Sequence, residues 1–201
     1  MSVERKQSVA RIALHHRVRA IEDDVYGALT LSPPLCHYLA QQGVLISSLS
    51  KTVGAGLRLG WIAASPDVLA RIDPHAQSAH WGLSSINLAI GCHWISQGIA
   101  QQRVAWQTGE VTRRWRLAKK LLGPMMEQTH SPSPHIWLQL ADGDTPLVHT
   151  WRAAGIEGVP AQVFAVKSTT ANALRISLTA APNAQSLSVA LHRVAERLSD
   201  R

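Results

Sequence analysis

A lysine in this sequence stands between a run of hydroxyl side chains and a glycine-rich loop that ends in an arginine. The stretch reads SLSKTVGAGLRLGW, in which the lysine is Lys51 and the arginine is Arg58. A Walker-type phosphate loop needs glycines one and six residues before the lysine, but Ser50 and Leu45 occupy those positions. The dinucleotide-binding fingerprint needs another glycine spacing and a following helix, whereas LGWIAAS predicts a strand. The lysine therefore needs a different chemical role.

Polar side chains follow two of the predicted strands. RVRAI predicts a short strand that runs into EDDVYG, and GVLIS predicts a second strand that ends at the hydroxyl run. Ligand-binding groups of open α/β sheets gather at the carboxyl ends of strands, so we expect these side chains to be near neighbours. They are Asp23, Asp24 and Tyr26 after the first strand and Ser48, Ser50 and Lys51 after the second.

This combination of groups has a specific chemical use. Pyridoxal phosphate chemistry needs an amine that bonds to the cofactor, an anion for the protonated pyridine nitrogen and a hydrogen-bond donor for the ring oxygen. It also needs cations for the phosphate. A carboxylate, a phenol, a lysine and an arginine in one crevice would meet these needs. Taken singly, each residue has an ordinary alternative as a turn former, a packing residue or a surface ion-pair partner, so the order of the residues carries the hypothesis.

The elements that must position these residues form an α/β part. Apolar spacing predicts a helix over 3–16, and RLGWIAAS predicts a third strand. Only residues 52–57 separate the second and third strands, which is too short for a parallel crossover, so the third strand should run antiparallel to the second. A helix begins at Ser65-Pro66-Asp67, and the helical pattern continues to Leu122 with breaks near Asp73-Pro74 and Trp81-Gly82.

The remainder predicts a compact α+β part. SPSPHIWLQL and ALRISL read as strands, and TPLVHTWRAAG reads as a helix that Gly155 closes. NAQSLSVALHRVAERL predicts a final helix with Asn183 as its cap and Leu187, Leu191, Val194 and Leu198 on one face. Since Gly123-Pro124 ends the preceding helical stretch, we expect one domain over 1–122 and a second over 123–201.

Composition narrows the class of protein. The 201 residues are 46% hydrophobic and 16% charged, which fits a globular protein with a sizeable core. No apolar run approaches the roughly 18 residues of a membrane span, and the charged opening MSVERKQ is unlike a signal peptide, so we expect a cytoplasmic protein without membrane contact. Cys36 and Cys92 are expected to be buried thiols, and the histidines lack metal-binding spacing, so no metal is expected.

The net charge of +7 points to an anionic partner. The densest basic cluster, TRRWRLAKK, lies within a predicted amphipathic helix. A solvated helix face explains this cluster better than a nucleic-acid-binding stripe, because no helix-turn-helix, zinc-finger or RNA-binding signature is present nearby.

The motifs EDDVYG and SLSKTVGAGLRLGW together resemble the cofactor-binding core of class I and II aminotransferases of fold type I. More narrowly, they are similar to the aminotransferase-like domain of MocR-type regulators of the GntR family. HIWLQL, VPAQVFAV and ALRISLTAAPN resemble the small domain of that group in the same order, so the resemblance covers nearly the whole chain. It implies an α/β fold: part of the fold type I large domain, with a mostly parallel sheet and an antiparallel strand after the lysine, followed by a small α+β domain.

The resemblance also implies pyridoxal 5'-phosphate as cofactor, and a role for each matching residue. Lys51 would bond covalently to the cofactor, and Asp23 would hold the proton on the pyridine nitrogen. Tyr26 would donate a hydrogen bond to the ring hydroxyl oxygen. Burial next to Arg58 would disfavour the ammonium form of Lys51, although the cofactor phosphate acts in the opposite direction.

The remaining roles concern anionic groups. Ser48 and Arg58 would bind the cofactor phosphate, where arginine contributes a bidentate fork that lysine does not have. Ser50 would belong to the same cofactor-binding set. Arg175 in ALRISL would bind the α-carboxylate of an amino acid or amine ligand. A homodimer is implied for the full-length protein.

Two departures from the family pattern bear on cofactor binding. Ala55 stands where the group usually has proline, which loosens the loop that carries Arg58. The family's upstream glycine-containing phosphate loop, ring-stacking aromatic residue and Asn-Pro-x-Gly segment do not occur here. We therefore expect a C-terminal part of a longer protein, in which DNA contact comes only from an upstream winged-helix domain. We also expect weak or absent cofactor binding by this chain alone.

Three functions remain open at this point. The first is the effector domain of a MocR-type transcriptional regulator, which the wording EDDVYG favours. The second is an aminotransferase that moves an amino group between an α-amino acid and a 2-oxo acid. The third is a basic, non-catalytic fragment, which the +7 charge and the missing upstream motifs favour.

Overall fold

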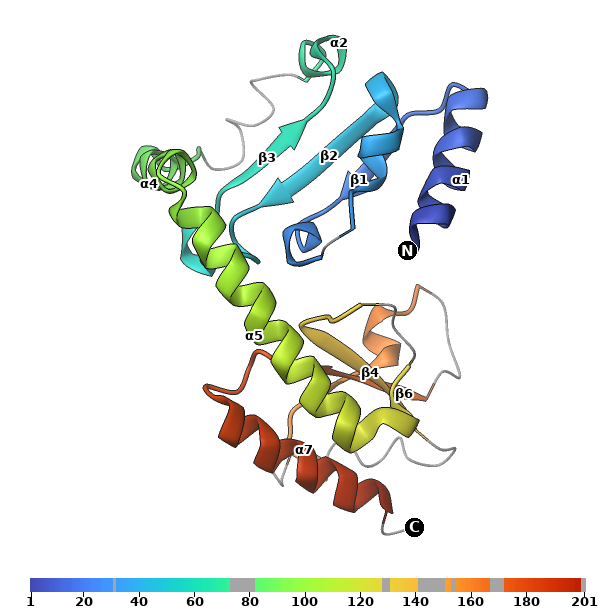
Figure 1. The fold of residues 1–201 in the computed structure, drawn as a ribbon, viewed down its shortest axis with the longest axis vertical. Helices are drawn as coiled ribbons and strands as arrows, with labels where there is room; N and C mark the ends of the chain where they lie inside the picture. Colours follow the sequence, from blue (N-terminus) through green and yellow to red (C-terminus); the bar gives the residue numbers. More distant parts are fainter. Residues whose placement is uncertain are drawn as a thin grey trace. The chain divides into compact units, whose positions relative to one another are not determined.

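The computed structural model describes residues 1–30, 32–72, 82–127, 131–140, 151–152, 155–166 and 172–199 (Figure 1). The α-helices are α1 Val3–His15, α2 Pro66–Leu69, α4 Ser85–Ser96, α5 Ile99–Leu122 and α7 Ala184–Ser199. The strands are β1 Ala20–Asp23, β2 Gly43–Ser48, β3 Gly60–Ala63, β4 His135–Gln139, β5 Val159–Pro160 and β6 Ala173–Ser177. Short 3-10 turns are η1 Gly27–Leu29, η2 Leu35–Tyr38, η3 Ala40–Gln42, η4 Ala55–Leu57, η5 Gly123–Met125 and η6 Ala161–Phe164.

The chain divides into two compact units, Met1–Thr108 and Gly109–Arg201. The division falls inside α5, upstream of the Leu122–Gly123 junction that the sequence indicates as a domain boundary. That boundary stays a prediction, and the two units are described separately below.

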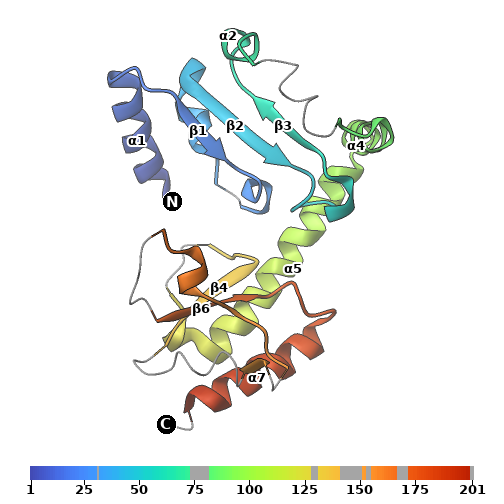
Figure 2. The same ribbon diagram turned by 180° about the vertical axis from the view of Figure 1, so that it is seen from behind.

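The first unit contains a three-stranded sheet with β2 in the centre, as Figures 1 and 2 show from opposite sides. β1 runs parallel to β2, and β3 runs antiparallel to β2. The antiparallel direction predicted from the short connection is confirmed. Within the described part of the chain, β1 and β3 each pair on one side only, so both outer edges of this sheet present unpaired backbone groups.

Two of the predicted strands begin later than their sequence pattern suggests. Arg17, the second residue after the end of α1, has a φ of 54°, and the first strand begins at Ala20 rather than Arg17. Arg58 has a φ of 47°, and the third strand begins at Gly60. A left-handed backbone conformation is incompatible with an extended strand, which explains both shifts.

Apolar side chains anchor the chain around the lysine motif. Leu49 and Val53, two residues to either side of Lys51, are buried, as are Leu57 and Leu59 around Arg58. These four residues form one cluster with Ala100 of α5, and Trp94 of α4 packs against it. The backbone of the loop is therefore fixed by burial, whereas the side chains of Lys51 and Arg58 are exposed.

The long predicted helical region has a break that the sequence analysis did not predict. Gly98, with a φ of 72°, separates α4 from α5. Of the two predicted breaks, the residues from Asp73 to Trp81 lie outside the described part of the chain. The predicted end at Leu122 is confirmed, because η5 begins at Gly123.

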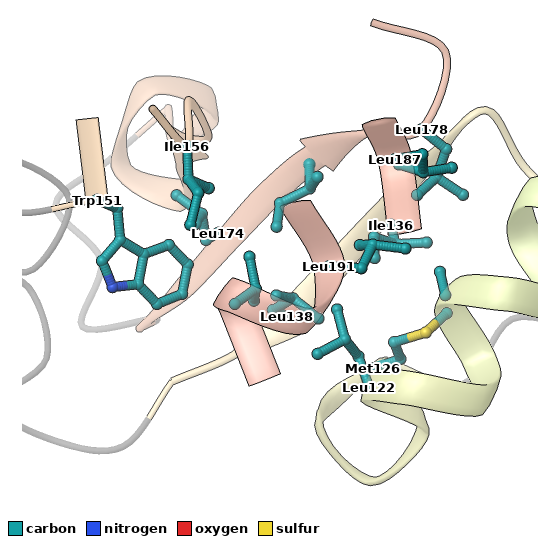
Figure 3. Packing of buried hydrophobic residues seen from close by; sticks show 13 residues of the cluster. Leu122, Met126, Ile136, Leu138, Trp151, Ile156, Leu174, Leu178, Leu187 and Leu191 are labelled. Carbon is teal, nitrogen blue, oxygen red and sulfur yellow. The ribbon is translucent and has the colours of Figure 1, made fainter. Parts of the chain in front are cut away.

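The second unit contains an antiparallel sheet of order β4-β6-β5 whose apolar residues pack with α5 and α7 (Figure 3). Leu122 of α5, Ile136 and Leu138 of β4, Leu174 of β6 and Leu191 of α7 are nearly inaccessible to solvent. The predicted cap of α7 is confirmed, since Asn183 Oδ1 accepts a hydrogen bond of 2.8 Å from the Ser186 backbone N–H.

Two further features of the helices concern the segment before Gly155 and the question of a membrane span. Most of the helix predicted in TPLVHTWRAAG lies outside the described residues, although Gly155 has the positive φ of 74° expected of a helix-closing glycine. Among the described helices, none is both long and apolar enough to cross a bilayer.

Candidate functional site

The carboxyl ends of β1 and β2 lie side by side. Asp23, the last residue of β1, is the register partner of Ile46, and the Asp24 backbone N–H donates to the Ile46 carbonyl at 2.8 Å. The buried Ser47 hydroxyl donates to the Asp24 carbonyl at 3.2 Å. The segments EDDVYG and SLSK therefore leave the same edge of the sheet together.

Lys51 and Tyr26 meet at this edge. The Lys51 ammonium nitrogen lies 5.9 Å from the centroid of the Tyr26 ring, within the range of a cation–π interaction. The prediction that the two clusters are neighbours is thus confirmed for this pair. The burial expected for Lys51 is wrong, because its side chain and that of Arg58 are both exposed in this chain.

The Ser48 hydroxyl closes the lysine loop. It donates a hydrogen bond of 2.8 Å to the Leu59 carbonyl and accepts one of 3.0 Å from the Ser50 backbone N–H. The Thr52 hydroxyl donates to the Ser48 carbonyl at 3.2 Å. Because a serine hydroxyl has a single proton, Ser48 can contact a phosphate in this arrangement only by giving up its bond to Leu59.

Arg58 occupies the left-handed region with φ 47° and ψ 34°, directly after η4. Its neighbours Leu57 and Leu59 are buried, so the backbone turns at Arg58 and leaves the guanidinium outside. Gly60, two residues after Arg58, has no room for a side chain, because a Cβ there would lie 2.9 Å from the Ser47 carbonyl oxygen of β2.

The acidic side chains of EDDVYG have different surroundings. Asp23 is exposed, and its Oδ1 accepts a long hydrogen bond of 3.3 Å from the Val25 backbone N–H. Burial raises the pKa of Asp24, and the negative charge of Glu22 raises that pKa further, while Lys6 opposes the shift. Of the two aspartates, Asp23 is therefore the one whose carboxylate is exposed and can pair with a positively charged group of a ligand.

Glu22 has a role that sequence reasoning missed. Its two carboxylate oxygens accept hydrogen bonds of 2.8 Å each from the backbone N–H groups of Leu35 and Cys36, at the start of η2. The carboxylate thereby fixes the connection that leads from Tyr26 to β2. The sequence shows a carboxylate directly before Asp23, but the N–H groups that it binds can be identified only from the three-dimensional structure.

The two cysteines do not share one environment. Cys36 is partly buried next to Glu22, and burial followed by the Glu22 hydrogen bond raises the pKa of its thiol to about 11. Cys92 is exposed on α4, so the prediction of burial is wrong for this residue. An otherwise apolar helix sequence suggested burial, but the described part of the chain does not cover that side of α4.

Arg175 belongs to the second unit. It is the central residue of β6, pairs with Trp137 of β4 and Val159 of β5, and its guanidinium carbon lies 4.6 Å from the centroid of the Phe164 ring. Among the described residues of the second unit, Arg175 therefore contacts an aromatic ring and the backbones of two neighbouring strands.

Arg114 is a second residue that sequence reasoning did not single out. It is buried on α5, its Nε donates to Glu110 at 2.7 Å, and one terminal nitrogen donates to the carbonyls of Leu178 and Ala181 at 2.9 and 2.7 Å. The side chain ties the turn after β6 to α5. Its place in TRRWRLAKK hid this role, since the cluster reads as a solvated basic face.

Within the described residues, no group of three or more His, Cys, Asp or Glu side chains has an arrangement that could hold a metal ion. The edge of the sheet carries an amine, a phenol and a carboxylate, from Lys51, Tyr26 and Asp23, and the loop after Lys51 carries the exposed guanidinium of Arg58. This set fits the aldehyde, ring oxygen, ring nitrogen and phosphate of pyridoxal 5'-phosphate.

Comparison with known proteins shows the family of the chain. Residues 1–194 match the family model described as aminotransferase class I and II. The chain belongs to this family. The cofactor of class I and II aminotransferases is pyridoxal 5'-phosphate, and the α/β fold predicted from the sequence is the fold of the family.

The individual relatives include proteins named as regulators and proteins named as enzymes. The HTH-type transcriptional regulator YdfD of Bacillus subtilis, itself uncharacterized, is 29% identical over 142 residues, which cover 68% of this chain and 28% of YdfD. The aromatic-amino-acid aminotransferase 1 of Thermococcus litoralis is 23% identical over 212 residues, covering 100% of this chain and 51% of that enzyme. The similarity therefore extends to both regulators and enzymes.

Solved structures support the fold. An archaeal alanine:glyoxylate aminotransferase superposes with a TM-score of 0.85 at 20% identity, covering 100% of this chain and 53% of that protein. The chain thus spans about half the length of this aminotransferase, and a smaller share of the regulator.

Proposed function

We propose that this chain supplies the lysine side of a pyridoxal phosphate site, and the small domain next to it, in the effector domain of a MocR-type transcriptional regulator. The bound ligand would be an amino acid or amine. In the full-length protein we expect a cytoplasmic homodimer that contacts DNA only through an upstream winged-helix domain.

Each site residue has a defined task in this proposal. Lys51 would hold the cofactor through its amine and would move a proton at the ligand's α-carbon. Asp23 would keep the ring nitrogen protonated, and Tyr26 would donate a hydrogen bond to the ring oxygen. Pyridoxal phosphate supplies an aldehyde and an electron-withdrawing ring, which the side chains of proteins lack.

The remaining residues bind anionic groups. Arg58 and the Ser48 and Ser50 region would hold the phosphate, and Arg175 would pair with the ligand α-carboxylate. The observation that carries the proposal is the approach of Lys51 to Tyr26 at the shared edge of β1 and β2. This approach supports a cofactor site because the two residues come from separate motifs that the family pattern requires together.

The regulator is preferred because the motif EDDVYG resembles the regulator group, and because YdfD is similar over 68% of this chain. The second candidate is a stand-alone aminotransferase, acting between an α-amino acid and a 2-oxo acid. Coverage of the whole chain by the Thermococcus litoralis enzyme favours that alternative. A non-catalytic fragment is the third possibility, and the exposure of Lys51 favours it.

Selective reaction at Lys51 tests the cofactor site. The chain is incubated with pyridoxal 5'-phosphate, reduced with borohydride, and the modified lysines are mapped by mass spectrometry. We expect weak binding by this chain alone, but modification at Lys51 well ahead of exposed lysines such as Lys119 and Lys120. Lys119→Arg serves as a matched control, because it removes only its own modification site and should leave the extent of modification at Lys51 unchanged. Equal modification of Lys51 and Lys119 would contradict the proposed site.

Two measurements separate the regulator from the enzyme. The first is the reading frame upstream of the Met1 codon, where a winged helix supports the regulator and an aminotransferase start supports the enzyme. The second is half-transamination of the cofactor-loaded protein with a broad panel of amino acids. Conversion of the cofactor to its amine form with any of them would favour the enzyme.

A further inference from the structure

Arg175 lies on the face of its sheet that is turned away from the hydrophobic core. Its neighbours along β6, Leu174 and Ile176, are buried in the cluster with α5 and α7. Because side chains alternate along a strand, Arg175 points to the opposite face. Its register partners Trp137 and Val159 lie on that same face, in a row across the sheet.

Two aromatic rings hold this region together. The guanidinium carbon of Arg175 lies 4.6 Å from the centroid of the Phe164 ring, which comes from η6 just after β5. The Phe164 ring in turn packs edge to face against Trp137, with centroids 5.4 Å apart and an interplanar angle of 76°. Arg175, Phe164 and Trp137 thus form a continuous row of contacts, which we call the aromatic platform.

In the part of the chain that the structure describes, the contact with Phe164 leaves the N–H groups of Arg175 available. Among the described residues, no carboxylate forms a salt bridge with Arg175, whereas Arg114, Arg113 and Arg152 all have one. A guanidinium whose face lies on a ring still has its N–H groups in the guanidinium plane. Those groups match the two oxygens of a carboxylate that approaches in the same plane.

We infer that Phe164 is a positioning residue that holds Arg175 ready for in-plane binding of a carboxylate, and that Trp137 supports Phe164 from the side. The inference rests on the proposed function, in which Arg175 receives the ligand α-carboxylate. It adds that the affinity of Arg175 for a carboxylate depends on the ring beneath it. An arginine side chain has several rotatable bonds, so ordering it in advance lowers the entropy lost on binding.

The test follows Arg175 by NMR in the whole chain without cofactor. The probe is pyruvate, a 2-oxo acid, and pyruvamide is its neutral control. We expect pyruvate, but not pyruvamide, to shift the Arg175 Nε–H and Trp137 indole N–H signals. Phe164→Leu should weaken pyruvate binding by about three- to five-fold, the size expected of a lost cation–π contact, and Phe164→Tyr should restore it to within about two-fold.

A second readout needs no ligand. The Phe164 ring should displace the Arg175 side-chain signals by its ring current, and Phe164→Leu should abolish this displacement while the core methyl signals of Leu174 and Ile176 stay unchanged. Absence of the displacement in the unmodified chain would overturn the inference.

The outcomes separate the inference from the function on which it rests. If Arg175→Ala abolishes the pyruvate response but Phe164→Leu leaves the affinity unchanged, the inference is wrong and the role of Arg175 stands. If Arg175→Ala leaves the pyruvate response unchanged, or if the unmodified chain shows none, the carboxylate-binding role of Arg175 is itself contradicted, and the inference is overturned with it.

Discussion

The Ser48 hydroxyl lies 2.8 Å from the Leu59 carbonyl oxygen and joins the residue after Arg58 to the end of β2. The same hydroxyl accepts the Ser50 backbone N–H, so one side chain shapes the loop on both sides of Lys51. These two hydrogen bonds fix the backbone of the loop that carries both Lys51 and Arg58.

Ser48→Ala should lower the free energy of unfolding by about 1 to 2 kcal/mol, because the Ser50 backbone N–H loses its acceptor and the Leu59 carbonyl loses one of its two donors, keeping only the Leu49 backbone N–H. Urea unfolding measures this change. Ser65→Ala is the matched control, since Ser65 precedes α2 but makes no side-chain capping hydrogen bond. Equal stability losses in the two variants would contradict the importance of the Ser48 contact.

Arg58→Gly should keep or raise stability, by up to about 1 kcal/mol, because glycine adopts a left-handed backbone without the steric cost that arginine bears. Ala40, with a φ of 48°, offers the comparison Ala40→Gly at a site away from the lysine loop. Thermal unfolding should place both variants at or above the unmodified chain. Only Arg58→Gly should reduce the trapping of pyridoxal phosphate at Lys51, and a clear loss of stability in Arg58→Gly would show that its guanidinium has a structural role.

Asp24 should make the first unit less stable as pH rises. Burial, reinforced by Glu22, raises the pKa of Asp24 above its ordinary value of 3.8, so the folded chain retains a proton that the unfolded chain releases. Stability should therefore fall as pH rises from about 3.8 through the raised pKa, and Asp24→Asn should remove this slope. NMR titration of the Asp24 carboxyl carbon checks the pKa directly. A titration midpoint at or below the ordinary value would refute this prediction.

Arg114→Met should destabilise the second unit by about 3 kcal/mol, because two carbonyls and one carboxylate lose a buried partner. Arg113→Met is the control, since Arg113 pairs with the same Glu110 but its side chain is 64% exposed, and a change within about 0.5 kcal/mol is expected there. Denaturant unfolding of both variants gives the comparison. Similar losses would mean that Arg114 contributes only charge.

The same contact should weaken in acid. Hydrogen bonds from Arg114 and then Arg113 lower the pKa of Glu110 below its ordinary value of 4.5. Stability from this carboxylate is complete above pH 4.5 and is lost as pH falls through the lowered pKa. Glu110→Gln should therefore flatten the acid side of the stability profile, and an unchanged profile would exclude this contribution.

Cys92 should be alkylated long before Cys36. The thiol pKa of Cys36 is about 11, so at about pH 8 only about one molecule in a thousand carries the reactive thiolate, whereas Cys92 is exposed on α4. Iodoacetamide labelling followed by peptide mass spectrometry gives the order of reaction. Faster labelling of Cys36 would contradict the environment described here.

The sequence was most informative where one local rule dominates. The short connection after β2 determined the antiparallel direction of β3, and Asn183 was recognisable as a helix cap from its position alone. The edge shared by β1 and β2 followed from the tendency of parallel strands to end together. These features depend on a few neighbouring residues, so they could be predicted without knowledge of the tertiary structure.

The features that were missed depend on distant partners. Arg58 and Arg17 have left-handed backbones although arginine seldom adopts this conformation, so no residue-type rule predicted them. The partners of Arg114 lie 64 and 67 residues away, and those of Glu22 lie 13 and 14 residues away. Hydrogen bonds across such separations exist only once the chain path is known.

The boundary between the two units, at Thr108 and Gly109, lies within α5, which is continuous from Ile99 to Leu122. Proteases cut most readily where a chain has an exposed, irregular backbone that can enter their clefts, and a helix offers none at its centre. Mild digestion should therefore spare this junction and act elsewhere. Whoever wishes to study either unit in isolation will have to sever a helix, and each product will carry a frayed end that the intact molecule never exposes.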